Sequence, residues 1–251
     1  MLIKAAINGG RTKAEHSAVP VSPAEQAAAV TDCLKAGAGA IHLHVRLTSG
    51  GHDRESLFAE DVAQTLSAVR ATAPGASIGV STGAWIITDV EARLQAVADW
   101  KVQPDFASVN FSEGGAVELA KLFLSRGVAV EAGLIDSASA RAFVASGLAA
   151  NCLRVLIEPQ EQQLAQALET VRAIEDVLKS GAIDRPRVLH GTEATTWPML
   201  DEAIARGYDV RIGLEDTRVL PDGRIAKDNV ELVTEAVRRV RKRAGASTPS
   251  V

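Results

Sequence analysis

Residues from two distant parts of this 251-residue sequence have the types and spacing of a metal site. His42 and His44 are separated by one residue in an apolar run, and residues i and i+2 of a strand share a face. Two imidazoles on one side of a strand can hold one ion, and Glu215 is a candidate third ligand, because two His and one carboxylate leave a catalytic position open. The alternative is a pair of separately hydrogen-bonded core histidines.

Asp216 follows Glu215 directly. Successive carboxylates cannot share a face of a regular strand, so one can coordinate a metal while the next turns towards a substrate. We therefore predict Asp216 to be a general base, with a pKa that the metal and nearby Arg211 influence. The alternative is a solvated pair of carboxylates, with Arg211 in a salt bridge.

Hydroxyl and amide side chains follow two further apolar runs. Ser81, Thr82 and Gly83 are consecutive, and two hydroxyls beside a glycine let a ligand carboxylate approach backbone N–H groups. Helix capping explains the same residues equally well. Ser108 and Asn110 share one face of the next run, so we expect both to face a substrate.

Two titratable residues lie inside otherwise apolar runs. Glu131 is costly to bury unless it is paired, and we expect Arg11 to be its partner. His190 is interpreted as a packed histidine, with a proton-transfer group or a phosphate contact as the alternatives.

Short β-branched runs alternate with helix-length segments along the whole chain. The runs are residues 2–8, 40–46, 77–81, 106–111, 128–135, 153–158, 187–190 and 210–214. The expected helices cover residues 23–36, 56–71, 89–100, 116–126, 137–146, 160–180, 198–206 and 228–243. Eight such units in an α/β sequence, most of them apolar on both faces, predict a single (β/α)8 TIM barrel. A doubly wound open sheet is the alternative, but residues 8–11 are not a G-x-G-x-x-G motif.

Helix ends carry recognisable signals. Ser22 to Glu25 reads as a capping box with a proline at the first helical position, and Gly37 is a stop signal. Thr88 to Glu91 reads as a second capping box. We expect one domain over residues 1–251, with a disordered tail over residues 244–251.

Composition narrows the possible functions. The chain is 47% hydrophobic with a net charge of −4, which is unlike a disordered chain or a nucleic-acid-binding protein with a basic face. No run approaches the length of a membrane span, and we see no signal peptide. Two cysteines cannot form a disulfide framework, so a reducing cytoplasm is the expected location.

Several motifs, in this order along nearly the whole chain, resemble the β-keto acid cleavage enzyme family. They are residues 8–12, His16, Pro20, residues 36–38, the H-x-H-x-R of residues 42–46, the S-T-G of residues 81–83 and the R-x-G-x-E-D of residues 211–216. The resemblance implies a (β/α)8 barrel with a divalent metal, usually Zn²⁺. It implies the ligands His42, His44 and Glu215, the base Asp216, and Arg211 as an electrostatic partner. It also implies that residues 81–83 lie near the substrate carboxylate.

The implied reaction condenses a β-keto acid with acetyl-CoA and cleaves the adduct in a retro-Claisen step to acetoacetate and a new CoA thioester. The resemblance also implies a homo-oligomer, often a tetramer. The charge and hydropathy of the chain predict no nucleic-acid or membrane partner. The family member that cleaves 3-keto-5-aminohexanoate has an acidic residue where this chain has Arg11, and Glu131 matches another acidic position of that pocket. We therefore expect a substrate with a neutral or anionic tail.

Another departure is Leu47, where family members commonly have an acidic residue after the arginine of H-x-H-x-R. We expect Asp53 to supply the missing contact, if it is supplied at all. Two other functions stay open: a metal-dependent hydrolase on the same fold, and a non-catalytic metabolite-binding barrel.

Overall fold

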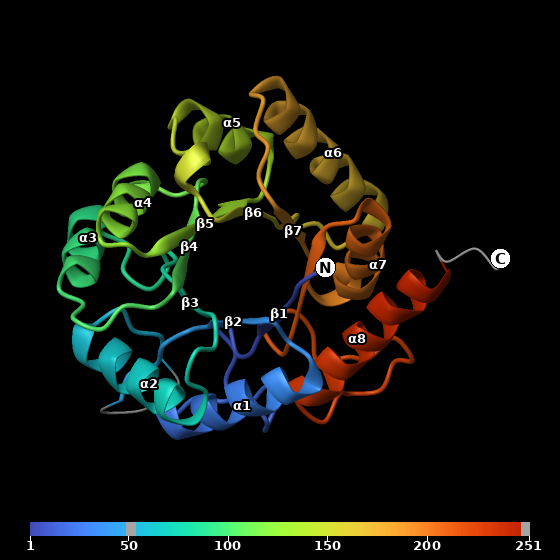
Figure 1. The fold of residues 1–251 in the computed structure, drawn as a ribbon, viewed down its shortest axis with the longest axis horizontal. Coiled ribbons are helices and arrows are strands. Elements are labelled where there is room, and N and C mark those ends of the chain that lie inside the picture. Colours follow the sequence, from blue (N-terminus) through green and yellow to red (C-terminus); the bar gives the residue numbers. More distant parts are fainter. Residues whose placement is uncertain (49–53, 247–251) are drawn as a thin grey trace.

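The computed structural model describes residues 1–48 and 54–246. Its centre is a closed barrel of eight parallel strands in sequence order, in which β8 returns to pair with β1 (Figure 1). The strands are β1 Ile3–Ala6, β2 Ala40–Leu43, β3 Ile78–Ser81, β4 Phe106–Asn110, β5 Ala129–Leu134, β6 Arg154–Ile157, β7 Arg187–Leu189 and β8 Asp209–Ile212. The predicted (β/α)8 TIM barrel is therefore confirmed, and the open sheet is excluded.

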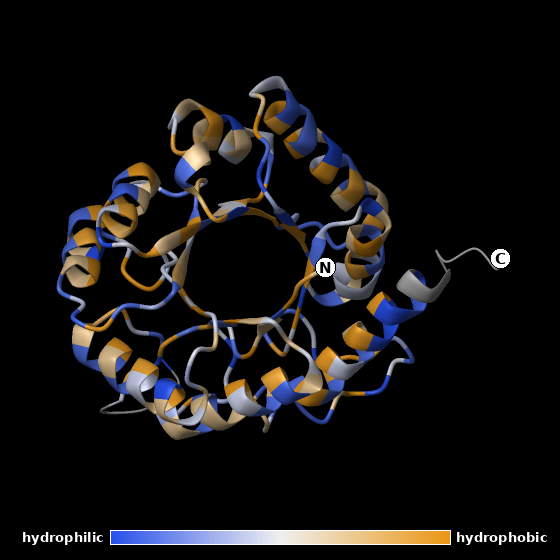
Figure 2. Ribbon diagram, viewed as in Figure 1, coloured by the Kyte–Doolittle hydropathy of each residue, from blue (hydrophilic) through white to orange (hydrophobic). Residues whose placement is uncertain are grey.

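Eight helices form a ring around the strands (Figure 1). They are α1 Pro23–Ala36, α2 Ala59–Thr72, α3 Val90–Ala98, α4 Ala116–Ser125, α5 Ser137–Ala145, α6 Leu164–Ser180, α7 Thr196–Arg206 and α8 Asn229–Ala246. Apolar residues colour the strands and alternate with polar residues along the helices (Figure 2). Buried aliphatic side chains of the helices and strands form one core cluster between the two layers. Across the described residues, no helix is long and apolar enough to cross a membrane.

Local chemistry sets several helix ends. Ser22 caps α1 in a complete capping box with Glu25, and Gly37 ends the helix at φ 111°, as predicted. The expected box at Thr88 is wrong, because Asp89 is the cap and accepts a hydrogen bond from the N–H of Ala92.

Several helix boundaries also differ from the sequence predictions, by two to four residues. The helix expected from residue 160 begins at Leu164, because residues 160–163 form a loop after β6 in which Gln160 donates to the carbonyl of Glu158. Helix α8 continues to Ala246, so residues 244–246 of the expected tail are helical. Residues 247–251 lie outside the described part of the chain.

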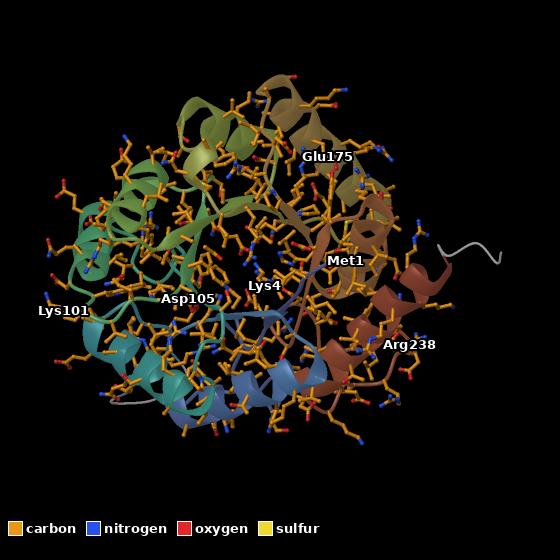
Figure 3. The ribbon with its side chains drawn as sticks, in the orientation of Figure 1. Met1, Lys4, Lys101, Asp105, Glu175 and Arg238 are labelled. Atoms are coloured by element: carbon orange, nitrogen blue, oxygen red, sulfur yellow. The ribbon has the colours of Figure 1, made fainter. Side chains whose placement is uncertain are left out.

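A charged cluster lies inside the barrel. Glu131 of β5 is fully buried and pairs with Arg154 of the adjacent strand β6 and with Lys4 of β1, a strand that is not adjacent to β5. Figure 3 shows Lys4 within the ring of strands. The predicted partner Arg11 is therefore wrong: it contacts Glu193 and Glu15 outside the barrel interior, where its loop follows β1.

Candidate active site

A cavity of about 530 Å³ lies among residues that follow the carboxyl ends of the strands. In barrels of this type, active sites occur at that end. Its lining comes from the carboxyl ends of all eight strands and the segments that follow them: Gly10, His44, Glu55, Trp85, Asn110, Ser112, Glu113, Ile135, Glu158, Gln160, His190, Thr192, Arg211, Glu215 and Asp216.

Three of the sequence-predicted residues meet at this cavity. His42 is in β2, His44 follows directly after it, and the two rings are 5.1 Å apart at a steep angle of 83°. Glu215 follows β8. One ligand atom from each of these three residues lies within 4.8 Å of the other two, so the expected convergence of two imidazoles and a carboxylate is confirmed.

The chemistry of this donor set fits a cation. Nε2 of His44 and Oε2 of Glu215 are buried and lack hydrogen-bond partners within the described residues. Nε2 of His42 lies 3.7 Å from Oε2 of Glu215, and Nε2 of His44 lies 3.3 Å from Oε1 of Glu215. Buried polar atoms without partners are costly, and a shared divalent ion would satisfy them.

The protonation of the three groups follows from their surroundings. Burial lowers the pKa of His42 well below its usual value, so this imidazole is neutral and has a free lone pair. Burial opposes the charge on His44, but Glu215 and Glu55 outweigh it and raise its pKa to about 9. Burial likewise opposes the charge on Glu215, and the positive charge of Arg211 reverses that effect and lowers its pKa.

The backbone of His44 is held by the loop after β1. Oδ1 of Asn8 accepts from the N–H of His44 at 2.9 Å, and Nδ2 of Asn8 donates to the carbonyl of His44 at 2.9 Å. These two hydrogen bonds take the place of backbone hydrogen bonds between strands, because β2 ends at Leu43. They explain physically why an asparagine begins the N-G-G-R motif.

Glu55 holds the ring of His44 from the opposite side. Its Oε1 contacts Nδ1 of His44, and its Oε2 accepts from the indole Nε1 of Trp85 at 2.9 Å. An antiparallel bridge between Glu55 and Arg46 brings this carboxylate to the site. A carboxylate on the far nitrogen of a ligating histidine fixes its tautomer and orientation. Asp53, the expected source of such a contact, lies outside the described residues.

Ser108, inside the barrel, contacts the ring of His42. Nδ1 of His42 lies 3.4 Å from Oγ of Ser108, and that hydroxyl donates to Oε1 of Glu131 at 3.0 Å. Ser108 therefore connects the imidazole to the buried charged cluster. That Ser108 and Glu131 bind substrate stays a prediction.

Two glycines let Glu215 reach the histidines. A Cβ on Gly213 would lie 1.9 Å from the carbonyl oxygen of Ala6, and a Cβ on Gly9 would lie 2.3 Å from Cγ of Glu215. Gly9 also has a φ of +54°, which disfavours any other residue. The glycine of R-x-G-x-E-D and the first glycine of N-G-G-R therefore allow the loop after β8 to pack against β1.

Arg211 and Asp216 lie side by side under the cavity. The guanidinium donates to Asp216 from Nη2 at 2.8 Å and from Nε at 3.2 Å, and Nη2 also contacts Glu215. Nδ1 of His190 lies 3.4 Å from Oδ1 of Asp216, and its Nε2 lies 3.3 Å from Oε2 of Glu158. Burial and Arg211 oppose a charge on this imidazole, but Asp216 and Glu158 raise its pKa above the usual value. His190 is buried as expected, yet it also lines the cavity.

The remaining sequence-predicted residues, Asn110 and residues 81–83, differ in whether they line the cavity. Asn110 lines the cavity. Thr82 turns its hydroxyl inward and donates to the carbonyl of Ser108 at 2.7 Å, whereas Ser81 is buried in β3. Gly83 lies under the ring of Trp85, which a Cβ would meet at 2.2 Å. None of these three residues after β3 is among those lining the cavity.

Sequence reasoning missed several residues of the cavity, among them Glu55, Trp85 and Glu158. Glu55 and Trp85 follow loops of irregular length, and no spacing rule would have pointed to them. Glu158 is different, because it directly follows β6. A carboxylate at the carboxyl end of a barrel strand is itself a signal, and it was overlooked because the preceding run is apolar.

The chain matches the family model described as beta-keto acid cleavage enzyme over residues 1–248. A curated relative, 3-keto-5-aminohexanoate cleavage enzyme of Fusobacterium nucleatum subsp. nucleatum, is 29% identical over 256 residues, covering 95% of this chain and 90% of the relative. The protein of the same name from Acetoanaerobium sticklandii is 27% identical over 257 residues, with the same coverage.

Solved structures similar to this one include ObcA in its apo form, bound to oxaloacetate, and in a ternary complex with a C4-CoA adduct and oxalate. Each has a TM-score of 0.70 at 16% identity and covers 90% of this chain. This chain spans 62% of the apo ObcA chain and 64% of the two complexed ones, less than two thirds of their length. The similarity to ObcA shows the fold.

Proposed function

The chain belongs to the beta-keto acid cleavage enzyme family, and on that premise we propose that it condenses a β-keto acid with acetyl-CoA and cleaves the adduct to acetoacetate and a new acyl-CoA. The observation that carries this proposal is the convergence of His42, His44 and Glu215 beside the Arg211–Asp216 pair in one cavity. An acyl transfer that breaks a C–C bond needs an electrophilic centre and a base in the same place.

The proposed resident cofactor is a divalent metal, Zn²⁺, held by Nε2 of His42, Nε2 of His44 and a carboxylate oxygen of Glu215. When bound there, such an ion polarises the ketone of a β-keto acid as a Lewis acid. The neutral imidazole of His42 and the carboxylate of Glu215 are the forms that bind a metal.

Asp216 is proposed to take and return the mobile proton of the reaction. Its carboxylate is fully buried and is held by Arg211 through Nη2 and Nε. A fixed guanidinium next to the reacting atoms also stabilises the oxyanion that develops when the ketone is attacked. His190, on the other side of Asp216, fixes the orientation of the carboxylate.

Binding of the substrate carboxylate is proposed to involve residues 81–83, at and directly after the end of β3. Asn110, the last residue of β4, is proposed to contact another part of the substrate from the wall of the cavity. Lys and Arg side chains at the rim would meet the CoA phosphates. ObcA, whose complexes contain oxaloacetate or a CoA adduct, shows that a barrel of this fold can accommodate both kinds of ligand. We further propose a cytoplasmic homo-oligomer, a tetramer as the family resemblance implies.

Elemental analysis of the purified protein, together with turnover of a panel of β-keto acids, tests this function. Mass spectrometry should detect acetoacetate and the matching acyl-CoA only when acetyl-CoA is present. The double variant His42→Ala, His44→Ala should lose both the metal and the turnover. Hydrolysis of a substrate without acetyl-CoA would indicate a metal-dependent hydrolase instead, and bound metabolite without turnover of any panel member would indicate a binding protein.

A further inference from the structure

One carboxylate of the cavity is not accounted for by the proposed chemistry. Glu55 is held by His44 and Trp85, and Glu113 by Asn110, Arg93 and the N–H of Ala84. Glu215 and Asp216 share Arg211. Glu158 contacts His190 through Oε2, but its Oε1 has no hydrogen-bond donor among the described residues.

A second free acceptor lies beside it. Asn110 donates from Nδ2 to Oε1 of Glu113 at 2.8 Å. This bond fixes the orientation of the amide, so that Oδ1 of Asn110 points away from Glu113. A Cβ on Gly133 would lie 2.6 Å from Oδ1 of Asn110 and 2.7 Å from Oε1 of Glu158. The two oxygens therefore flank one point above Gly133, and we call them the Asn110–Glu158 acceptor pair.

None of the described residues donates a hydrogen bond to either oxygen of the pair. Among the described residues that line the cavity, Arg211 is the only lysine or arginine, and it is occupied by Glu215 and Asp216. Gly133 brings no side chain. A carboxylate oxygen and an amide oxygen directed at one place accept from N–H or O–H groups, and they repel a carboxylate.

The geometry points to Glu158 as a specificity-determining residue, which with Asn110 binds an ammonium or hydroxyl group on the tail of the β-keto acid. This inference rests on the proposed function, whose substrate class it specifies. It excludes the anionic tail that was one of the expectations from Arg11, because Arg11 is in contact with Glu15 and Glu193 and does not line the cavity.

Four β-keto acids of similar length test the assignment: 3-ketohexanoate, its 5-hydroxy and 5-amino derivatives, and 3-ketoadipate. We expect kcat/KM to be higher for the hydroxy and amino acids than for 3-ketohexanoate by about 10-fold or more, and lowest for the dicarboxylate. Equal values for the first three, or a preference for 3-ketoadipate, would overturn the assignment.

Variants of Glu158 separate hydrogen bonding from charge. In Glu158→Gln, the preference for the hydroxy acid over 3-ketohexanoate should persist and that for the amino acid should fall, because the amide still accepts but has no charge. In Glu158→Ala, both preferences should disappear. Glu169→Gln, on the exposed face of α6, is the matched control and should keep both. Because ratios within one variant are compared, a general loss of activity does not hide the result.

Calorimetric titration of each β-keto acid into the metal-loaded protein, without acetyl-CoA, keeps this test separate from the proposed reaction. A preference for the hydroxy and amino acids that Glu158→Ala abolishes supports the acceptor pair even if no panel member is turned over, in which case only the proposed function fails. If panel members are turned over but their affinities do not depend on the tail, only the role of the acceptor pair is contradicted, and the proposed function stands.

Discussion

Oδ1 of Asp216 lies 3.4 Å from Nδ1 of His190 and 2.8 Å from Nη2 of Arg211. The carboxylate is thus held between an imidazole and a guanidinium, in a fully buried position that still lines the cavity. Both neighbours fix its orientation and leave it able to exchange a proton with a substrate. A general base needs this combination of reach and fixed geometry.

Replacing Asp216 with asparagine should lower kcat by about 10²-fold or more, the usual scale for a general base. The metal content should not change, because Asp216 is not among the three converging ligands. Steady-state kinetics and elemental analysis of the same preparation check both parts. Wild-type turnover in Asp216→Asn would exclude Asp216 as the base.

Glu215→Gln, unlike Asp216→Asn, should weaken metal binding. The amide has the same shape but is neutral and binds a divalent ion more weakly, so the metal content after dialysis should fall. Arg211 would also lose a carboxylate partner. Elemental analysis after dialysis against a chelator gives the result, with Glu169→Gln as the control. Unchanged metal content would reject Glu215 as a ligand.

The metal ligands were predictable because they follow a simple rule of the fold. Strands alternating with helices indicated the barrel, and the H-x-H and E-D pairs sit where β2 and β8 end. No rule of spacing could place Glu55, which reaches His44 only through an antiparallel bridge after a loop. Side-chain direction was equally hidden, as Ser108 shows by facing His42 beneath the cavity.

The predicted pairing of Glu131 with Arg11 was wrong for a different reason. A buried glutamate must be paired, and the sequence indicated that Glu131 would be. Which cation pairs with Glu131 depends on how the strands are staggered in the barrel. In this barrel, the stagger brings Lys4 and Arg154 into contact with Glu131. Lysine in a buried strand was not considered as a partner, although a carboxylate from a nearby strand stabilises it.

Glu55→Gln should weaken metal binding without removing it. The amide keeps the shape of the side chain but loses the charge that orients His44 and increases the basicity of its ring. Loss of such a contact typically costs 10–100-fold in metal affinity. Competition with a chromophoric chelator measures the change, and Glu60→Gln on the exposed side of α2 is the control. Equal affinities for the two variants would show that Glu55 does not support the ligand.

Glu131→Gln should destabilise the fold by about 3–5 kcal/mol at pH 7, because it leaves Lys4 and Arg154 buried without a counter-charge. Burial alone would raise the pKa of Glu131, but the two cations outweigh it and lower this pKa far below its usual range. The stability from Glu131 is therefore complete above its unfolded pKa of about 4.3 and decreases as the pH falls below that value.

Denaturant unfolding of wild type and Glu131→Gln at pH 7, 5, 4 and 3 tests both statements. The difference in unfolding free energy should be largest at pH 7 and 5 and should narrow towards pH 3, because below about pH 4.3 the carboxylate at residue 131 of the unfolded wild type takes up a proton, and the variant has no such group. A difference that is the same at all four values would mean that the charge of Glu131 does not contribute.

Gly213→Ala should destabilise the protein and impair the site at once. The added methyl would lie 1.9 Å from the carbonyl oxygen of Ala6, a backbone atom that cannot rotate away, so β1 and the loop after β8 must separate. Overpacking of this kind costs about 3 kcal/mol, the upper end of the usual range, which corresponds to a fall in Tm of roughly 6–12 °C. Because the same loop carries Glu215, the affinity for the metal should fall as well.

Gly114→Ala is the matched control, since its Cβ would have its nearest neighbour, Cγ2 of Val90, at 3.4 Å. Calorimetry and chelator competition should show both losses in Gly213→Ala alone; a stable variant with wild-type affinity would mean that close packing of this loop on β1 does not position the ligand.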